Sequence, residues 1–367
     1  MNRRIRVRTY GGVRGVELIV PLYSIESSGT GVFIPTVELI ENNPELEMVP
    51  LEADAMSYIQ DGAIGGHGVS LHPFDFDWDW ERDGLWLGDI ELESFDDYVI
   101  ATLENISMYG HNFVMKVFVN YEETPFRVQG GEDFTETFLF SIESGYEAKI
   151  PFVLDLEDPE GDATYKLTVA IFGDPERHMI DGDAHWNFDD YTTNFGSIVE
   201  RYLVFGAGGE VILGEYNTEP LASRENKFFT TIQVNTDLDV EDFYTRESSY
   251  PPVRSIQVRA GEEIELAWFV NTVIEIRNDE LVTADDYVVV GLLDWEQIPL
   301  NDKTYFYVDA SDHDFEQRVD FGHLTIKALN EVGKYDFMAF LAPNPKHLTE
   351  LLYPLESTVR ITIEVVE

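Results

Sequence analysis

The amino-acid sequence predicts an all-β protein with two β-sandwiches in tandem and a β-rich N-terminal region. Three observations support this prediction. The chain has 367 residues, of which 44% are apolar and 13% aromatic, and this is enough for more than one core. Short runs rich in Val, Ile, Phe, Tyr and Thr alternate with Gly, Pro and acidic turns. These runs fall into two blocks, and each block is long enough for one sandwich.

The first block contains five predicted strands. Each is a short apolar or alternating segment that ends at a turn signal, and the acidic turn from Asp155 to Asp162 precedes the last one. The predicted strands are 98–103, 113–119, 137–142, 144–154 and 164–172.

The second block predicts a seven-stranded set, with Trp268 as a core aromatic on an early strand. The predicted strands lie within 256–270, 287–293, 303–308, 319–328, 334–341 and 358–366, and the first of these segments contains a turn.

The two blocks also share phrases that predict a diverged tandem repeat. Ala260-Gly-Glu-Glu-Ile-Glu-Leu266 matches Ser144-Gly-Tyr-Glu-Ala-Lys-Ile150, and 335–343 matches 165–173. The spacing between the two phrases differs between the blocks.

These same phrases carry a family resemblance. Over roughly 80 residues, the strand order with Ser144-Gly-Tyr146 and Ala163-Thr-Tyr165 resembles the cell-adhesion-related immunoglobulin-like domains of prokaryotic surface proteins. Gly333-Lys-Tyr335 resembles the penultimate strand of immunoglobulin-like domains, where Gly-x-Tyr is common. The resemblance implies immunoglobulin-like sandwiches.

From these patterns the chain divides into five parts. They are a basic N-terminal arm (1–16), a β-rich N-terminal region (17–95), a first sandwich (96–200), a connector (201–227) and a second sandwich (228–367). The second part reads either as a separate small β domain or as an extension wrapped on the first sandwich.

The charge predicts a surface built for concentrated salt. The chain has 70 acidic and 24 basic residues, so its formal net charge is -46. Such a body repels itself at low ionic strength, whereas at about 1 M salt the Debye length falls to about 3 Å and most of that repulsion disappears. The pattern resembles proteins of halophilic archaea and of their viruses, and the alternative is an ordinary, highly soluble acidic protein.

Basic residues are concentrated at the N-terminus. Arg3, Arg4, Arg6, Arg8 and Arg14 lie in the first sixteen residues, which contain no acid. One interpretation is a docking arm that pairs with an acidic partner surface. The other is a first strand whose arginines lie against the acidic body of the same molecule.

Two acidic clusters are candidate sites for a divalent cation, calcium or magnesium, although the protein requires no cofactor in this interpretation. In the first, Asp75, Asp77, Asp79 and Asp83 supply oxygen ligands with part of the spacing of a calcium loop. However, Trp80 and Trp86 occupy the positions where such a loop needs Gly and Glu. The alternation of aromatic and acidic residues from Phe74 favours a strand with one face of carboxylates.

In the second cluster, Asp181, Asp183, His185 and Asp189 flank Gly182 and are able to converge on one ion. A solvated loop is the alternative, and it is favoured because carboxylates are abundant throughout this chain.

Several classes of function are disfavoured. The chain has no Cys, which excludes disulfides, thiolate zinc sites and cysteine nucleophiles. We find no zinc-protease, nucleophile-elbow, phosphate-loop or dinucleotide motif, so no enzymatic activity is expected. The negative charge disfavours nucleic acid. No apolar run is long enough to span a bilayer and no secretory signal is recognised, so membrane insertion is not expected.

The sequence therefore predicts a non-enzymatic structural component of a virion, such as a capsid decoration, turret or tail protein. It would dock through its basic arm, associate with other structural proteins of the same assembly and form homo-oligomers. The alternative is an adhesin or layer protein at the extracellular surface, binding calcium or carbohydrate.

Overall fold

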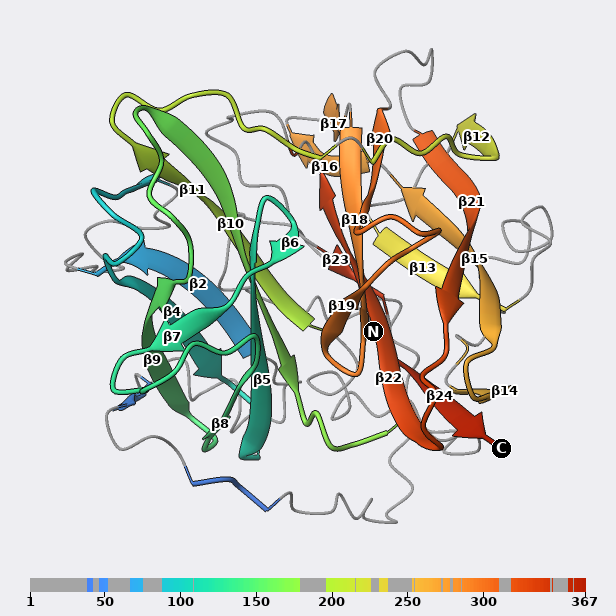
Figure 1. The fold of residues 1–367 in the computed structure, drawn as a ribbon, viewed down its shortest axis with the longest axis horizontal. Coiled ribbons are helices and arrows are strands. Elements are labelled where there is room, and N and C mark those ends of the chain that lie inside the picture. The colour runs from blue at the N-terminus through green and yellow to red at the C-terminus, as the bar shows by residue number, and fades with distance from the viewer. Residues whose placement is uncertain are drawn as a thin grey trace, which may run out of the picture.

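The computed structural model describes residues 38–41, 46–51, 67–74, 88–107, 109–178, 196–214, 216–225, 231–236, 253, 255–271, 273–277, 280–284, 286–309, 318–343, 345, 356–358 and 360–367. Within these ranges all regular secondary structure is β-strand, which confirms the predicted all-β fold (Figure 1). The same ranges contain no helix with the length and apolarity needed to cross a membrane.

The first sandwich consists of sheets A and B. Sheet A has the order β1-β9-β4-β2, and β7 also pairs with β9. Its strands are β1 (Glu47–Pro50), β2 (His67–Pro73), β4 (Val99–Asn105), β7 (Phe126–Val128) and β9 (Tyr146–Leu154). Sheet B has the order β3-β11-β10-β5-β6, and β8 also pairs with β5. Its strands are β3 (Ile90–Glu91), β5 (His111–Val119), β6 (Glu122–Glu123), β8 (Phe138–Ile142), β10 (Ala163–Gly173) and β11 (Gly196–Phe205).

The second sandwich consists of sheets C and D. Sheet D has the order β12-β21-β15-β13, with strands β12 (Ala222–Glu225), β13 (Thr231–Asn235), β15 (Glu263–Asn271) and β21 (Arg318–Lys327). Sheet C has the order β14-β24-β22-β18-β19, while β20 also pairs with β18 and β23 with β22. Its strands are β14 (Ser255–Arg259), β18 (Asp286–Leu293), β19 (Glu296–Ile298), β20 (Phe306–Asp309), β22 (Gly333–Pro343), β23 (Glu356–Ser357) and β24 (Ile361–Val366). A separate hairpin joins β16 (Val273–Arg277) and β17 (Glu280–Thr283).

Both sandwiches have immunoglobulin-like topology. In each one, the last strand lies between an antiparallel neighbour and a short parallel edge strand: β11 lies between β10 and β3, and β24 lies between β22 and β14. The strand β1 of the first sandwich corresponds to β12 of the second, because each precedes the other strands of its sandwich and pairs with the corresponding strand of the outer sheet. The fold is therefore a topological repeat.

One of the two repeat phrases joins equivalent strands and the other does not. Residues 165–173 and 335–343 lie on β10 and β22, which occupy the same place in their sheets. By contrast, 144–150 leads into β9 while 260–266 leads into β15, and the equivalent of β9 is β21. Each of the two misaligned segments consists of a glycine turn followed by an alternating strand. Several strands of a sandwich share this pattern.

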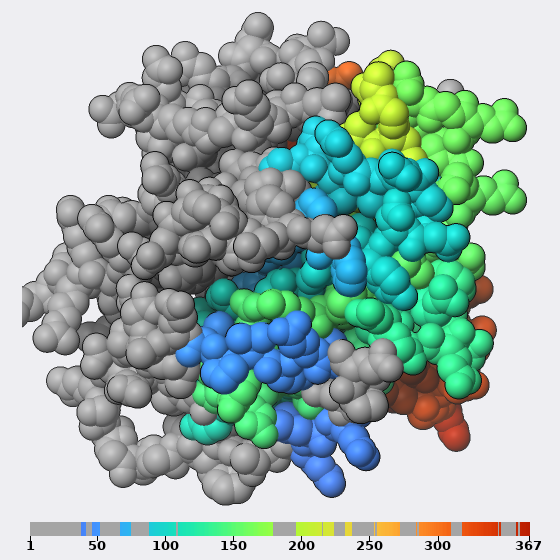
Figure 2. All heavy atoms as spheres, turned by 90° about the vertical axis from the view of Figure 1, so that its left-hand side faces the viewer, coloured from blue at the N-terminus to red at the C-terminus, as the bar shows by residue number. Residues whose placement is uncertain are grey.

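Strands near the predicted boundaries belong to the sandwich sheets. β2 and β3 lie within 17–95 and pair with β4 and β11 of the first sandwich. β12 lies within 201–227 and pairs with β21. Figure 2 shows the outer side of the first sandwich, where β1 and the segment around β3 lie at the surface.

Four sheets therefore stack in the order A, B, C, D, with three apolar layers between them. One core lies between sheets A and B, and another, which includes the fully buried Trp268, lies between sheets C and D. A third joins sheet B to sheet C. Trp268 is a core residue, as the sequence predicts.

Candidate functional site: the junction between the two sandwiches

The junction is the set of side chains on the facing sides of sheets B and C. Its apolar part includes Val114, Phe118 and Phe172 from the first sandwich, and Val288, Trp295 and Phe340 from the second. Every residue of β5 and of β18 is buried. Alternate residues of β5, such as Phe113 and Val114, enter different cores, because successive side chains of a strand point to opposite faces.

Two aromatic residues reach across the junction from matching hairpin turns. β5 and β6 are joined by Asn120 and Tyr121, and β18 and β19 by Asp294 and Trp295. All four residues have positive φ, from 50° to 68°, as a two-residue type I′ turn requires. This backbone is unfavourable for an aromatic residue and persists where packing holds it. The Tyr121 ring meets Tyr305 with centroids 5.9 Å apart, and Trp295 meets Phe172 at 5.2 Å.

The two hairpins also exchange hydrogen bonds. The backbone NH of Glu123 donates to Oε1 of Gln297 at 2.7 Å, and the backbone NH of Gln297 donates to Oε2 of Glu123 at 2.9 Å. The Gln297 side-chain amide also donates to the carbonyl oxygen of Tyr121 at 2.8 Å. Glu123 pairs with the buried ammonium of Lys116 as well.

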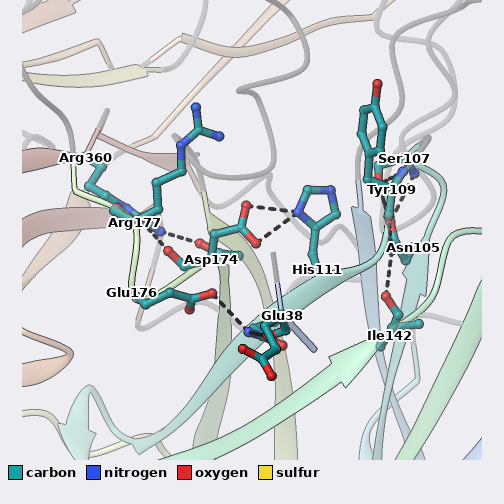
Figure 3. Close-up of polar contacts among 12 residues, drawn as sticks. Glu38, Asn105, Ser107, Tyr109, His111, Ile142, Asp174, Glu176, Arg177 and Arg360 are labelled. Atoms are coloured by element: carbon teal, nitrogen blue, oxygen red, sulfur yellow. Dashed lines mark hydrogen bonds and ion pairs between the residues drawn. The ribbon is translucent and has the colours of Figure 1, made fainter. Parts of the chain in front are cut away.

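A buried arginine of the second sandwich binds the first (Figure 3). Arg360 is 0% exposed and donates from Nη1 to the carbonyl oxygens of Asp174 at 2.8 Å and Arg177 at 2.9 Å, and from Nη2 to that of Gly173. Its guanidinium carbon lies 4.7 Å from the ring centre of Trp295, and Nη1 is 3.7 Å from the Asp336 carboxylate. Burial lowers the pKa of Arg360 to about 10, so the guanidinium keeps its charge at neutral pH.

A second buried ion pair lies on the sheet B side. Lys166 contacts the carboxylate of Glu200, which also accepts hydrogen bonds from the Tyr121 hydroxyl at 2.7 Å and the Thr168 hydroxyl at 3.2 Å. Burial and the Glu200 carboxylate together raise the pKa of Tyr121 well above its ordinary value, so the phenol remains a donor. The cluster supplies hydrogen-bond partners for each of its buried charges.

A histidine–aspartate pair supports the loop that Arg360 binds. His111 Nδ1 lies 2.9 Å from an oxygen of Asp174, and the side chains of the two residues are 6% and 1% exposed (Figure 3). The neighbouring Asn112 amide donates to Glu176 in the same loop and to the carbonyl oxygen of Glu38. In a catalytic His–Asp pair the aspartate orients the histidine, which acts as the base, but the His111–Asp174 pair is buried. Its observed contacts hold the loop 173–177 against β5.

A second histidine lies close by. The His67 ring packs edge-on against Phe113 with centroids 5.5 Å apart. Burial, together with the nearby His111, lowers the pKa of His67 to about 4, so this imidazole is neutral at physiological pH.

The candidate site residues from the sequence lie outside the described ranges. This applies to the arm (Arg3, Arg4, Arg6, Arg8 and Arg14) and to both acidic clusters (Asp75, Asp77, Asp79, Asp83, Asp181, Asp183, His185 and Asp189). Those assignments remain predictions. In the part of the chain that is described, no three His, Asp or Glu side chains converge so as to hold a metal ion.

Sequence reasoning missed the junction. A signal for it exists in the apolar runs 113–119, which Lys116 alone interrupts, and 287–293, because a strand buried on both faces does not alternate. Arg360, by contrast, is a single arginine in no recognisable pattern, and only the fold reveals its contacts.

Comparison with known proteins adds likenesses of fold. No protein-family model matches the chain, and no curated protein matches it. Among solved structures, the C-terminal domain of the Streptococcus agalactiae antigen I/II polypeptide BspA is 12% identical, with a TM-score of 0.22, over 81% of this chain and 99% of that one. The C-terminal domain of the Streptococcus pyogenes antigen I/II-family protein AspA is 8% identical, with a TM-score of 0.19, over 82% and 99%.

The fibronectin(III)-like modules of Clostridium thermocellum CbhA are 9% identical, with a TM-score of 0.19, over 81% of this chain and 94% of that one. The sheets of this chain define its β-sandwich architecture by themselves. The chain consists of two immunoglobulin-like sandwiches joined face to face.

Proposed function

We propose that the chain is a non-enzymatic surface protein, an adhesin or layer component, in which the two sandwiches act as one rigid body. This proposal rests on the observed contacts at the junction between the two sandwiches. An apolar core, two crossing aromatic residues and the Arg360 contacts fix one sandwich against the other. A rigid tandem unit transmits force and keeps the loops at its ends at a fixed separation, as a protein of a surface assembly needs to do.

The rigidity is tested by measuring one distance in solution. The chain has no Cys, so Leu156→Cys and Val332→Cys place one spin label on an exposed site of each sandwich. We expect a single narrow distribution of distances in pulsed electron spin resonance. A broad distribution would show that the sandwiches move independently, and the rigid-body proposal would fail.

The location is tested by immunogold labelling of the cells that produce the chain. We expect label on the outer surface of intact cells. Label confined to the cell interior or to released particles contradicts a cell-surface role.

The second candidate is a structural protein of a virion. The observation that favours it is the cluster of arginines within residues 1–16 of a chain with a net charge of -46. Deleting residues 1–14 is expected to abolish incorporation into particles while leaving the sandwiches folded. Unchanged incorporation would remove the docking role of this arm.

A further inference from the structure

The two sandwiches meet through equivalent faces. The pairing Leu167↔Val119 in the first sandwich corresponds to Phe337↔Leu293 in the second, and Lys166↔Tyr202 corresponds to Asp336↔Thr362. These registers superimpose β5, β10 and β11 on β18, β22 and β24 without a shift. Each position on sheet B therefore has one defined equivalent on sheet C.

The hydrogen bonds between the two hairpins are those of a two-fold pair. Phe118 of β5 pairs with Glu123, and Leu292 of β18 pairs with Gln297, so Glu123 and Gln297 are equivalent residues. The NH of each one donates to the side chain of the other. When residue i contacts j and j contacts i in the same way, the interface is isologous, as in a symmetric dimer. The hairpin contacts within this chain have this reciprocal arrangement.

The charges at equivalent positions are reversed. Lys166 on β10 is equivalent to Asp336 on β22, and the pairing of β11 with β10 makes Glu200 equivalent to Arg360. The first sandwich thus holds Lys166 beside Glu200, and the second holds Asp336 beside Arg360. All four side chains are buried.

This charge reversal disfavours association between the first sandwich of one chain and the first sandwich of another. In such a pair Glu200 would lie where Arg360 lies now, facing the carbonyl oxygens of Gly173, Asp174 and Arg177. A carboxylate offers these oxygens no donor, and a buried charge without a partner is costly.

Side-chain size disfavours association between the second sandwich of one chain and the second sandwich of another. The equivalent of Phe172 on β10 is Ala342 on β22. Trp295 would then meet Ala342 in place of Phe172, its present neighbour, and the missing ring would leave a void.

We infer that the junction face of each sandwich is a recognition surface specific for the opposite sandwich. The partner that fits it in trans is the opposite sandwich of a second copy of this chain. Two chains that open at the segment between β11 and β12 therefore exchange sandwiches and form a closed dimer with the same contacts. This inference concerns assembly between copies and does not depend on the surface role proposed above.

The test begins with the whole folded chain. A protease site is inserted between Gly209 and Glu210, which are both exposed, and the folded protein is cut there. Two such preparations, one isotopically labelled, are mixed and followed by native mass spectrometry. We expect the halves to stay together at micromolar concentration and labelled and unlabelled halves to form mixed pairs, always one first sandwich with one second. Separation of the halves, or like pairs in comparable amounts, overturns the inference.

Two variants probe the face itself. Phe340→Ala removes the ring that lies 5.3 Å from Phe118, and in the cut protein we expect at least tenfold weaker association of the halves. Val332→Ala, at an exposed position in the turn before β22, is the matched control and leaves association unchanged. Equal affinities for the two variants contradict recognition through the junction, provided that circular dichroism shows both to be folded.

Discussion

At the scale of single residues, the interior of this acidic protein is balanced in charge. Among the described residues the buried bases are Lys116, Lys166, Arg201, Arg318 and Arg360, and the buried acids are Asp174, Glu200, Asp286, Asp320 and Asp336. Most of them contact an opposite charge or a hydroxyl, as in the Arg318–Asp320 pair and the hydrogen bond from the Tyr287 hydroxyl to Asp320. Because the two sets are equal in number, the other residues carry the whole net charge of -46.

Arg360 is the buried charge whose loss is expected to cost most. Arg360→Met retains much of the volume, but it removes the guanidinium beside the Asp336 carboxylate and the hydrogen bonds to the carbonyl oxygens of Gly173, Asp174 and Arg177. We expect the free energy of unfolding to fall by about 3 kcal/mol, measured by urea denaturation. Arg259→Met, at an exposed position, is the control, with an expected change of less than about 0.5 kcal/mol. Equal effects of the two changes would show that the Arg360 contacts contribute little.

Glu104 makes stability depend on pH in an unusual direction. It lies directly opposite Glu147 on neighbouring strands of sheet A, and burial together with the Glu147 carboxylate raises its pKa from 4.5 to about 7. The folded state thus holds this proton more tightly than the unfolded state does. The contribution to stability is present below pH 4.5 and is lost as the pH rises through 7.

Glu104→Gln removes this loss of stability at higher pH, because the glutamine amide does not titrate. Between pH 5 and pH 8 the stability of the variant, relative to the unmodified protein, is expected to rise by about 2 kcal/mol. The measurement is a series of urea titrations across this pH range, and the exposed Glu143→Gln serves as the control. A relative stability independent of pH would show that Glu104 titrates normally.

At the scale of the elements, a glycine allows the outer sheet of the second sandwich to pack. Gly322 on β21 pairs with Trp268 on β15, and a Cβ atom at position 322 would lie 2.5 Å from the indole ring. Gly322→Ala is therefore expected to cost about 1–3 kcal/mol of unfolding free energy and to shift the tryptophan fluorescence.

Gly209→Ala provides the control for this prediction, since its added Cβ would meet atoms no closer than 3.7 Å. An unchanged stability of Gly322→Ala would mean that the indole moves aside at little cost.

The strands were predictable from the sequence where a single pattern decides them. Alternation and turn residues placed 144–154 and 164–172 close to β9 and β10, and 287–293 close to β18. The same patterns recur on many strands, and so the repeat phrase at Ala260 was matched to β9 when β21 is the equivalent strand. The junction depends on which faces meet, and the single charge of Arg360 gains its carbonyl partners in the first sandwich only through that contact.

At the scale of the whole molecule, the excess of carboxylates predicts that salt stabilises the fold. Raising NaCl from 0.1 M to 1 M shortens the Debye length from about 10 Å to about 3 Å and weakens the repulsion between exposed acids. We expect the urea midpoint to rise over this range. A midpoint that stays constant would argue against adaptation to salt.

Charge reversal on the exposed acidic turn is the matched test of this explanation. Glu157→Lys with Glu160→Lys is expected to raise the midpoint in 0.1 M NaCl and to change it little in 1 M NaCl. The same gain at both concentrations would indicate a local effect of the turn and not relief of general repulsion.

The balanced interior also bears on how the molecule behaves in acid. Because the buried charges are already matched, acidification toward the isoelectric point near 4.2 neutralises mainly the outer carboxylates. The mutual repulsion that keeps copies dispersed then vanishes while the four stacked sheets still have their internal partners. We expect the protein to precipitate near this pH in a folded state and to redissolve when base is added.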